Sequence, residues 1–129
     1  MTPDERRSQL DQLTETILSA AFEVSNTLGA GFLEKVYQRA LLRELTLRKI
    51  KAIPQARFQV VYKTHLVGEY FADLLVENAI VLELKCTDRL TDDQMAQCLN
   101  YLHAANMTVC LLINFQNPTL EWKRIVQDF

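Results

Sequence analysis

Apolar residues recur every three or four positions in the first part of the chain, and this spacing predicts two amphipathic helices. The first begins at Thr2 and Pro3, because threonine can cap a helix and proline suits its first turn, and Gly29 ends it. Its apolar stripe is Leu10, Leu13, Ile17, Ala21, Val24 and Leu28. The second runs from about residue 32 to 49, and its widely spread apolar residues predict that it is well buried: Leu33, Val36, Ala40, Leu41, Leu42 and Leu45.

After Pro54, which breaks the helical pattern, the apolar residues follow the patterns typical of strands. Three strand-like segments come first: RFQVVYK, THLVGEYFADLLV and AIVLELK. A helix then covers TDDQMAQCLNYLHAA, with Thr91 or Asp92 as its cap and with Met95, Leu99 and Leu102 facing inward. MTVCLLINF is typical of a strand covered on both faces, and LEWKRIVQDF predicts an edge strand. The order ααβββαβ(β) predicts an α/β sandwich in which helices flank a mixed β-sheet.

The length of 129 residues predicts a single domain spanning residues 1–129. No apolar run reaches the length of a membrane span, and the N-terminus lacks the apolar segment of a signal peptide, so we expect no membrane association. The three cysteines, Cys86, Cys98 and Cys110, include no CxxC pair. Their number and spacing argue against a disulfide framework or a zinc site and favour buried thiols in a reducing cytoplasm.

The distribution of charge bears on possible partners. A net charge of −2 means that binding of nucleic acid needs a local basic patch. Such a patch is present in a stretch whose only acidic residue is Glu44: Arg39, Arg43, Arg48, Lys49, Lys51, Arg57 and Lys63. The alternative interpretation is an ordinary solvated helix face.

The segment FADLLVENAIVLELK, residues 71–85, combines apolar residues with charged ones. A hairpin with a three-residue turn at 77–79 places Asp73 opposite Glu83, so that both carboxylates point to one face. Lys85 shares that face because side chains alternate along a strand. A two-residue turn moves the register by one and separates the acids.

Two facing carboxylates repel each other unless a cation lies between them. Oxygen ligands suit Mg²⁺ or Mn²⁺, and a lysine two residues further on can position an attacking water. This combination predicts metal-assisted hydrolysis of a phosphodiester. The alternative is that Asp73, Glu83 and Lys85 form the solvent face of a strand, although charges among so many apolar neighbours are costly unless they are used.

Several motifs together resemble the GxxExxY protein family. GFLEKVY, at residues 31–37, resembles the family signature, and VGEYFADLLVENAIVLELK, AQCLNYL and LLINF follow in the family's order from about residue 11 to 126. The family is placed in the PD-(D/E)XK nuclease-like superfamily, and QCLNY resembles the QxxxY element of its RecB-type nucleases. The resemblance implies an αβββαβ restriction-endonuclease-like sandwich, with an additional helix at the N-terminus.

The resemblance also implies roles for individual residues. Asp73 and Glu83 are expected to hold the metal, together with the backbone carbonyl of Leu84, and Lys85 to position water. Glu34 is expected to be an additional acid at the metal or its waters. Gln97 is expected at the catalytic site. The expected substrate contacts are Tyr101, Gln94 and Arg43.

Less specific interpretations remain for some of these residues. Tyr37 and Tyr101 can be aromatic core residues, Glu34 a first-turn carboxylate favoured by the helix dipole, and Gln97 an ordinary polar helix residue. Many relatives carry a histidine at the position of Gln94, and neither His65 nor His103 replaces it.

Two functions follow from these observations. The first is a Mg²⁺- or Mn²⁺-dependent nuclease, with DNA favoured as the substrate. The second is a non-catalytic protein that keeps the nuclease fold and binds nucleic acid or protein as a scaffold. So small a nuclease is expected to need a protein partner or self-association to hold its substrate. A small-molecule hydrolase using Cys86 is disfavoured, because no histidine is placed to support a thiolate nucleophile.

Overall fold

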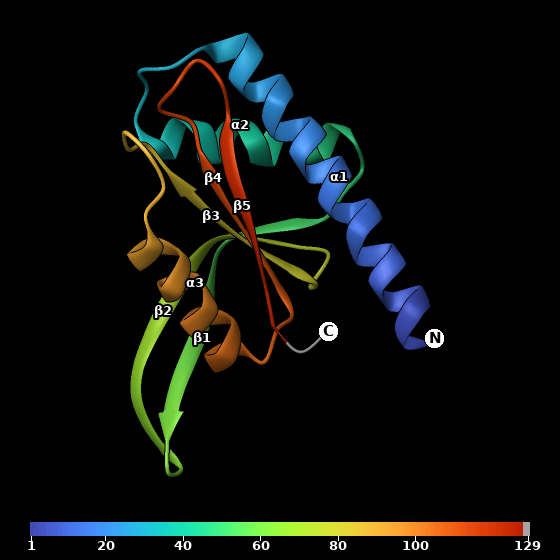
Figure 1. Ribbon diagram of the computed structural model, residues 1–129, viewed down its shortest axis with the longest axis vertical. Helices are drawn as coiled ribbons and strands as arrows, with labels where there is room; N and C mark the ends of the chain where they lie inside the picture. Colours follow the sequence, from blue (N-terminus) through green and yellow to red (C-terminus); the bar gives the residue numbers. More distant parts are fainter. Residues whose placement is uncertain (128–129) are drawn as a thin grey trace.

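Five strands form one mixed sheet with three helices packed on its two faces (Figure 1). The computed structural model describes residues 1–127. The elements are α1 (Pro3–Leu28), α2 (Glu34–Leu47), β1 (Ala52–Tyr62), β2 (His65–Val76), β3 (Ile80–Lys85), α3 (Asp92–Ala105), β4 (Val109–Asn114) and β5 (Glu121–Val126). The strand order is β1-β2-β3-β4-β5, and only β3 and β4 run parallel. The predicted αβββαβ sandwich with an additional N-terminal helix is confirmed.

Two apolar clusters lie on opposite faces of the sheet. One joins α1 and α2 to the sheet through residues such as Ile17, Leu41 and Leu111. The other joins α3 to the sheet through residues such as Leu102 and Leu112. All six residues of β4 are buried because helices cover both of its faces, as the continuous apolar run predicts.

The first helix agrees closely with its predicted boundaries. Thr2 caps α1 by accepting a hydrogen bond from the Glu5 N–H at 3.1 Å, with Pro3 in the first turn. Gly29 ends the helix with a φ of +74°, in the left-handed region that glycine tolerates. Within residues 1–127, no helix is both long and apolar enough to cross a membrane.

The second helix is shorter and less buried than predicted. It buries one face, which includes Tyr37, Leu41 and Leu45, whereas Leu33 is 79% exposed and Val36 is 38% exposed. The prediction of a well-buried helix was wrong because the sheet and α1 cover α2 on one side only. The remaining face is open and carries charged residues.

Tyr37 links the loop between α1 and α2 to the core. Its hydroxyl donates to the Gly29 carbonyl at 2.6 Å and accepts from the Phe32 N–H at 3.3 Å. Its ring stacks on Phe115 with a centroid distance of 4.6 Å. The aromatic core role considered for Tyr37 is confirmed, and its hydroxyl additionally satisfies the backbone of the loop that precedes Glu34.

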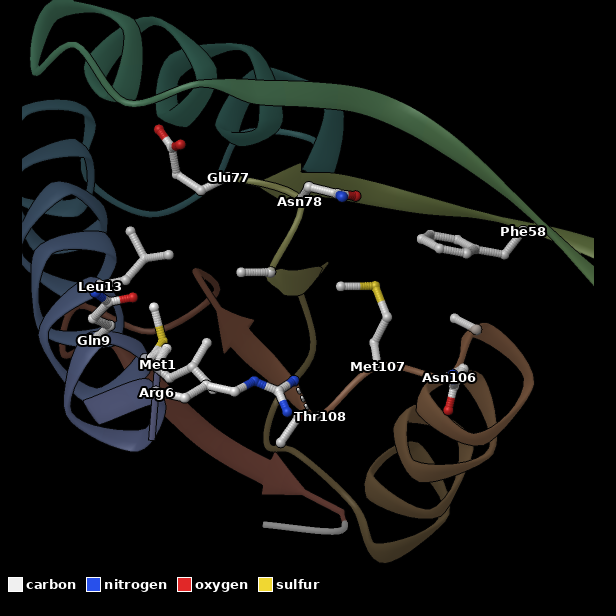
Figure 2. A pocket seen from close by; sticks show the side chains of 13 residues that line it. Met1, Arg6, Gln9, Leu13, Phe58, Glu77, Asn78, Asn106, Met107 and Thr108 are labelled. Carbon is white, nitrogen blue, oxygen red and sulfur yellow. Dashed lines mark hydrogen bonds between the residues drawn. The ribbon is translucent and has the colours of Figure 1, made fainter. Parts of the chain in front are cut away.

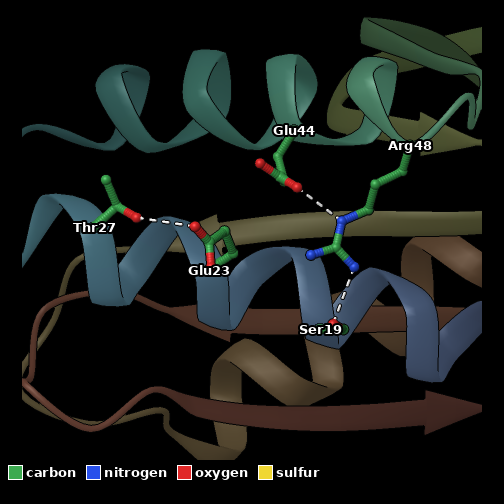
Figure 3. A network of polar contacts seen from close by, with 5 residues as sticks. All are labelled: Ser19, Glu23, Thr27, Glu44 and Arg48. Atoms are coloured by element: carbon green, nitrogen blue, oxygen red, sulfur yellow. Dashed lines mark hydrogen bonds and ion pairs between the residues drawn. The ribbon is translucent and has the colours of Figure 1, made fainter.

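A polar contact joins α2 to α1 on the side away from the sheet (Figure 3). Arg48 pairs with Glu44 at 2.8 Å and donates to the Ser19 hydroxyl at 3.0 Å. Near it on α1, Thr27 donates to Glu23 at 3.2 Å. Glu44 and Arg48 therefore serve the packing of the two helices, which takes Arg48 out of the predicted basic patch.

The first strand begins earlier than predicted. β1 starts at Ala52, and Pro54 lies inside it, paired with Leu74. A proline is tolerated at this position because β1 is the edge of the sheet and needs no further hydrogen-bonded neighbour. Beyond the sheet, β1 and β2 continue as a long two-stranded ribbon (Figure 1).

The predicted three-residue turn between β2 and β3 is confirmed. Val76 pairs with Ile80, and the Ala79 N–H donates to the Val76 carbonyl at 2.9 Å. Glu77 and Asn78 both adopt positive φ, at +52° and +51°, a conformation that asparagine tolerates well. The turn fixes the register on which the candidate site depends.

Thr91 caps the third helix as predicted, but the helix buries a different set of side chains. Cys98 and Leu102 are buried, whereas Leu99, which was predicted to face inward, is 44% exposed. β5 is the predicted edge strand, and the last two residues of that predicted strand, Asp128 and Phe129, lie outside the described residues.

Candidate active site

The pairing of β1 with β2 is interrupted beside Asp73. Pro54 pairs with Leu74 and Ala56 with Ala72, but the register passes over Asp73 and its neighbour on β1, where Gln55 has a φ of +52°. Residues two apart in a regular strand share a face, yet Ala72 belongs to the cluster under α3 and Leu74 to the cluster under α1 and α2. We conclude that β2 twists sharply at Asp73.

The twist replaces a backbone contact between β2 and β3 with a side-chain contact. The ladder reaches Leu74 and Leu82. The register is the predicted one, but the ladder ends before the next predicted pair, Asp73 with Glu83. Instead, Oδ2 of Asp73 accepts a hydrogen bond from the Leu84 N–H at 2.7 Å. The Asp73 carboxylate therefore takes the place of a strand carbonyl.

Glu83 lies next to this carboxylate and is 7% exposed. Its Oε1 atom is buried and has no hydrogen-bond partner among the described residues. Burial raises the pKa of Glu83, and the nearby negative charge of Asp73 raises it further, to about 8. Burying a carboxylate oxygen without a donor is costly, and a bound cation would compensate it. The two carboxylates therefore fit a divalent cation that prefers oxygen ligands, such as Mg²⁺ or Mn²⁺.

Lys85 ends β3 two residues after Glu83 and is half-buried. In the parallel ladder it pairs with Asn114 of β4. A hydrogen bond with Cys110 lowers the pKa of Cys98, and the positive charge of Lys85 lowers it further, against the effect of burial. Val81, on the same strand, belongs to the cluster under α3. Alternate side chains of a strand share a face, so Glu83 and Lys85 lie on the α3 side of the sheet.

Glu34 lies beyond the end of β3, at the first residue of α2. Its Oε2 accepts a hydrogen bond from the backbone N–H of Cys86 at 3.3 Å. Burial raises the pKa of the Cys86 thiol, and the charge of Glu34 adds to this effect. Within residues 1–127, no three His, Cys, Asp or Glu side chains form a group that could hold a metal. The structure thus brings Asp73 and Glu83 together without adding Glu34 as a third ligand.

Asn114 organises the loop that follows Lys85. It is fully buried, and its Nδ2 donates to the Thr87 carbonyl at 2.8 Å and to Glu121 Oε1 at 2.9 Å. Its Oδ1 accepts from the Thr87 N–H at 3.1 Å, and Glu121 Oε1 also accepts from the Leu90 N–H at 3.0 Å. Sequence analysis missed this residue. A polar amide at the end of the apolar run VCLLIN was the available signal.

The predicted QxxxY residues lie on α3 above the acidic pair. Burial raises the pKa of Tyr101, and the charge of Glu83 raises it further, while a hydrogen bond with Gln97 acts in the opposite direction. The Tyr101 ring stacks on Tyr70 with centroids 3.9 Å apart, and the Tyr70 hydroxyl donates to the Tyr101 carbonyl at 2.8 Å. Tyr101 is thus both a packing residue and a neighbour of the acids.

Tyr70 was missed by sequence analysis. It lies between Tyr101 and Phe58 in a three-ring stack, and burial followed by the charge of Glu83 raises its pKa. The alternation of apolar and polar residues along β2 does not distinguish Tyr70 from an ordinary aromatic residue of a strand. Its role depends on α3, which comes 22 residues later and packs over it.

The other two predicted substrate contacts lie elsewhere. Gln94 completes a capping box with Thr91, because its Oε1 accepts from the Thr91 N–H at 3.0 Å while its own N–H donates to the Thr91 hydroxyl at 3.2 Å. Arg43 is exposed on α2, about two and a half turns away from Glu34. The structure therefore brings Tyr101 close to Asp73 and Glu83, with Gln97 beside Tyr101, whereas the Gln94 side chain is engaged in the helix cap and Arg43 lies further along α2.

A cavity lies at the end of β3 opposite to the acidic pair (Figure 2). It measures about 680 Å³ and lies between the start of α1, the β2–β3 turn and the segment after α3, with Arg6, Phe58 and Met107 among its lining residues. Arg6 donates to the Thr108 hydroxyl there at 3.1 Å. Neither Asp73 nor Glu83 lines this cavity, so the cavity and the acidic pair are separate features.

The raised pKa of Glu83 predicts how stability depends on pH in the metal-free protein. The folded pKa of about 8 lies above the ordinary 4.5, so the folded state is favoured while Glu83 is protonated. This contribution to the free energy of unfolding is complete below pH 4.5 and is lost as pH rises towards 8. The slope is at most about 1.4 kcal/mol per pH unit. We expect Glu83→Gln to remove this slope and to raise the free energy of unfolding at pH 9, measured by urea denaturation in EDTA.

The matched control is Glu15→Gln, which removes a carboxylate from an exposed position on α1. It should leave the pH dependence as in the wild type. If Glu83→Gln and Glu15→Gln show the same pH dependence, the carboxylate of Glu83 is not held in the unfavourable environment described above.

Comparison with known proteins gives a consistent family and fold. The family model of the PD-(D/E)XK nuclease superfamily matches residues 11–125. Among solved structures, "Crystal structure of SSO0001" is similar in fold, with a TM-score of 0.55 and 16% sequence identity over 96% of this chain. This chain spans 63% of the length of that protein. No curated protein sequence matches.

The match covers β1 to β4, α2, α3 and all but the last residue of β5. It therefore includes the acidic pair, Lys85 and the α3 residues above them. The predicted resemblance to the superfamily is confirmed at this level, while the closer resemblance to GxxExxY proteins remains a prediction. On the evidence of this match and of the fold, the chain belongs to the PD-(D/E)XK nuclease superfamily.

Proposed function

We propose that this chain is a metal-dependent nuclease that hydrolyses phosphodiester bonds of nucleic acid, with DNA as the favoured substrate. The observation that carries the proposal is the buried Oε1 of Glu83, which has no hydrogen-bond partner within residues 1–127 and lies beside a second carboxylate. Two adjacent buried carboxylates are costly in free energy and give a protein scaffold no advantage. In a metal site, the bound cation compensates this cost. Membership of the nuclease superfamily supports the same reaction class.

Asp73 and Glu83 would hold Mg²⁺ or Mn²⁺, together with the backbone carbonyl of Leu84. When bound, the cation would supply positive charge to the phosphate and would lower the pKa of a water molecule. Glu34 points to the end of β3 at Cys86, and we assign it to water molecules around the cation rather than to the direct ligands.

The remaining residues act on water and substrate. Lys85 would position the attacking water by donating a hydrogen bond to it, and its charge would offset that of the phosphate. Gln97 and Tyr101 lie one helical turn apart and would hold the phosphate from the α3 side. Gln94 is engaged in the helix cap, so we propose that it acts through the position of α3 and not by touching substrate.

A second candidate function is that of a non-catalytic scaffold. Its support is the outer part of the β1–β2 ribbon, where Val61, Tyr62, Leu66 and Val67 are each at least 55% exposed. Exposed apolar residues grouped in this way favour a protein partner or a second copy of the chain. The nuclease remains the better-supported function, because the scaffold gives no reason for the acidic pair.

The three free cysteines suit a reducing compartment, and we propose that the protein acts in the cytoplasm. Cys98 and Cys110 are buried and Cys86 is half-buried. None of the three is tied to another by a disulfide, as is usual for proteins of that compartment.

The first test concerns the metal. Asp73→Asn keeps an oxygen that can accept the Leu84 N–H but removes the negative charge. We expect isothermal titration calorimetry with Mn²⁺ to show binding to the wild type and at least about a tenfold loss of affinity in the variant. Cleavage of plasmid DNA should be lost in parallel. Glu15→Gln, which changes an exposed acid on α1, is the control and should bind and cleave as the wild type does. Unchanged Mn²⁺ affinity in Asp73→Asn would contradict the proposed site.

The second test separates Lys85 from the metal ligands. Lys85→Ala removes the donor to the water but leaves both carboxylates, so we expect Mn²⁺ affinity to persist while cleavage falls by about a hundredfold or more. Lys123→Ala removes an exposed lysine from β5 and should change neither quantity. Full cleavage by Lys85→Ala would show that this lysine has no part in the reaction.

A further inference from the structure

The charges of this chain are strongly segregated. Residues 35–63 contain eight of the 14 basic residues and one of the 16 acidic residues. This stretch has a net charge of +7, whereas the rest of the chain has a net charge of −9. The stretch forms α2, the edge strand β1 and their connection, so the positive charge is gathered at one edge of the sandwich and not spread over it.

Three of these basic residues form a line on the open face of α2. Lys35, Arg39 and Arg43 are spaced four residues apart and are all exposed, on the side away from the buried Tyr37 and Leu41. None of the three side chains has a hydrogen bond or ion pair with any residue in the range 1–127. We call this line the α2 basic stripe.

The neighbouring arginines are occupied, unlike those of the stripe. Arg48 pairs with Glu44 at 2.8 Å, and Arg57 pairs with Glu69 across the β1–β2 ribbon at 2.5 Å. The stripe is therefore a set of free cations, in a region where the available carboxylates are already paired with other residues. An unpaired row of this kind suits a polyanion.

The stripe begins beside the candidate active site. Lys35 directly follows Glu34, whose carboxylate contacts the Cys86 N–H one residue beyond Lys85. From Lys35 the stripe extends about 12 Å along the helix to Arg43. That length corresponds to about three or four nucleotide steps of 3.4 Å along one strand. On the β1 side of α2, Gln38 accepts a hydrogen bond from Gln55 at 3.2 Å, which ties the helix to the sheet.

We propose that the α2 basic stripe binds the phosphate backbone of the nucleic acid on one side of the cleavage position. The inference rests on the proposed nuclease function and adds the path of the substrate, which enters at the first turn of α2. An anionic membrane is the other surface that attracts a basic helix. The stripe leads to a recessed acidic pair, which a flat lipid surface does not reach and a nucleic-acid strand does, so nucleic acid is the favoured partner.

The test uses binding alone and therefore does not depend on cleavage. Fluorescence anisotropy with a labelled DNA duplex is measured for the whole chain in EDTA over a series of KCl concentrations. Log affinity falls as log salt rises, and each lost phosphate contact should reduce the magnitude of this slope by about 0.9. We expect Arg39→Gln and Arg43→Gln each to reduce the magnitude of the slope by this amount and to weaken binding several-fold. The double variant should lose about twice as much in slope.

Lys123→Gln is the matched control, because it removes one positive charge from an exposed position outside the stripe. It should leave the slope unchanged, and the charge-conserving Arg39→Lys should stay close to the wild type. Equal effects of Arg39→Gln and Lys123→Gln would overturn the inference, as would wild-type protein that binds anionic vesicles and not DNA. A wild-type protein that binds through the stripe but cleaves under no metal condition would contradict the proposed function and leave the inference standing.

Discussion

The close approach of two carboxylates inside an apolar sheet is the constraint on which the rest of the site depends. Asp73 and Glu83 lie among the buried residues of β2 and β3, and their mutual repulsion adds to the cost of burying Glu83. The fold holds them in place by packing on both sides, since apolar clusters cover the two faces of the same strands. The metal-free chain thus carries an unfavourable charge arrangement that a divalent cation would relieve.

The surroundings of the pair explain how such an arrangement persists. The hydrogen bond from the Leu84 N–H fixes Asp73 at the point where the β2–β3 ladder ends. Asn114 anchors the loop after Lys85, and Tyr70 holds Tyr101 by stacking and by a hydrogen bond to its carbonyl. Each contact leaves the position of one functional residue with little freedom. Restricting the freedom of groups before a reaction is a general requirement of efficient catalysis.

The same geometry gives the molecule two differently charged regions. The acidic pair is recessed on the α3 side of the sheet, whereas the free cations lie along the open face of α2. Glu34, the first residue of α2, links the helix to the end of β3, because its carboxylate accepts a hydrogen bond from the Cys86 N–H, three residues after Glu83. In the proposed function, a substrate that carries one negative charge per nucleotide would lie with its backbone along the cations and with one phosphate at the metal ion held by the acids. The overall net charge of −2 hides this arrangement, because it averages over regions of opposite sign.

Much of this structure could be predicted from local patterns in the sequence. The turn at 77–79 fixed the pairing of Val76 with Ile80, because the length and residue types of a hairpin turn are local properties. The twist at Asp73 could not be predicted in this way. It depends on the left-handed backbone of Gln55, which lies 18 residues earlier on the neighbouring strand. The contacts of Asn114 and Tyr70 likewise join segments that are distant in the sequence. The spacing of residue types along the chain therefore could not predict them.

The most direct test of the central claim is to locate the cation. Crystals of the protein soaked in Mn²⁺ should give an anomalous difference peak between the carboxylates of Asp73 and Glu83, within about 2.0–2.6 Å of oxygen ligands. The account also predicts that the carbonyl of Leu84 is among these ligands. A peak at a different group of residues, or a site that stays empty at saturating Mn²⁺, would contradict the claim that this pair is a metal centre.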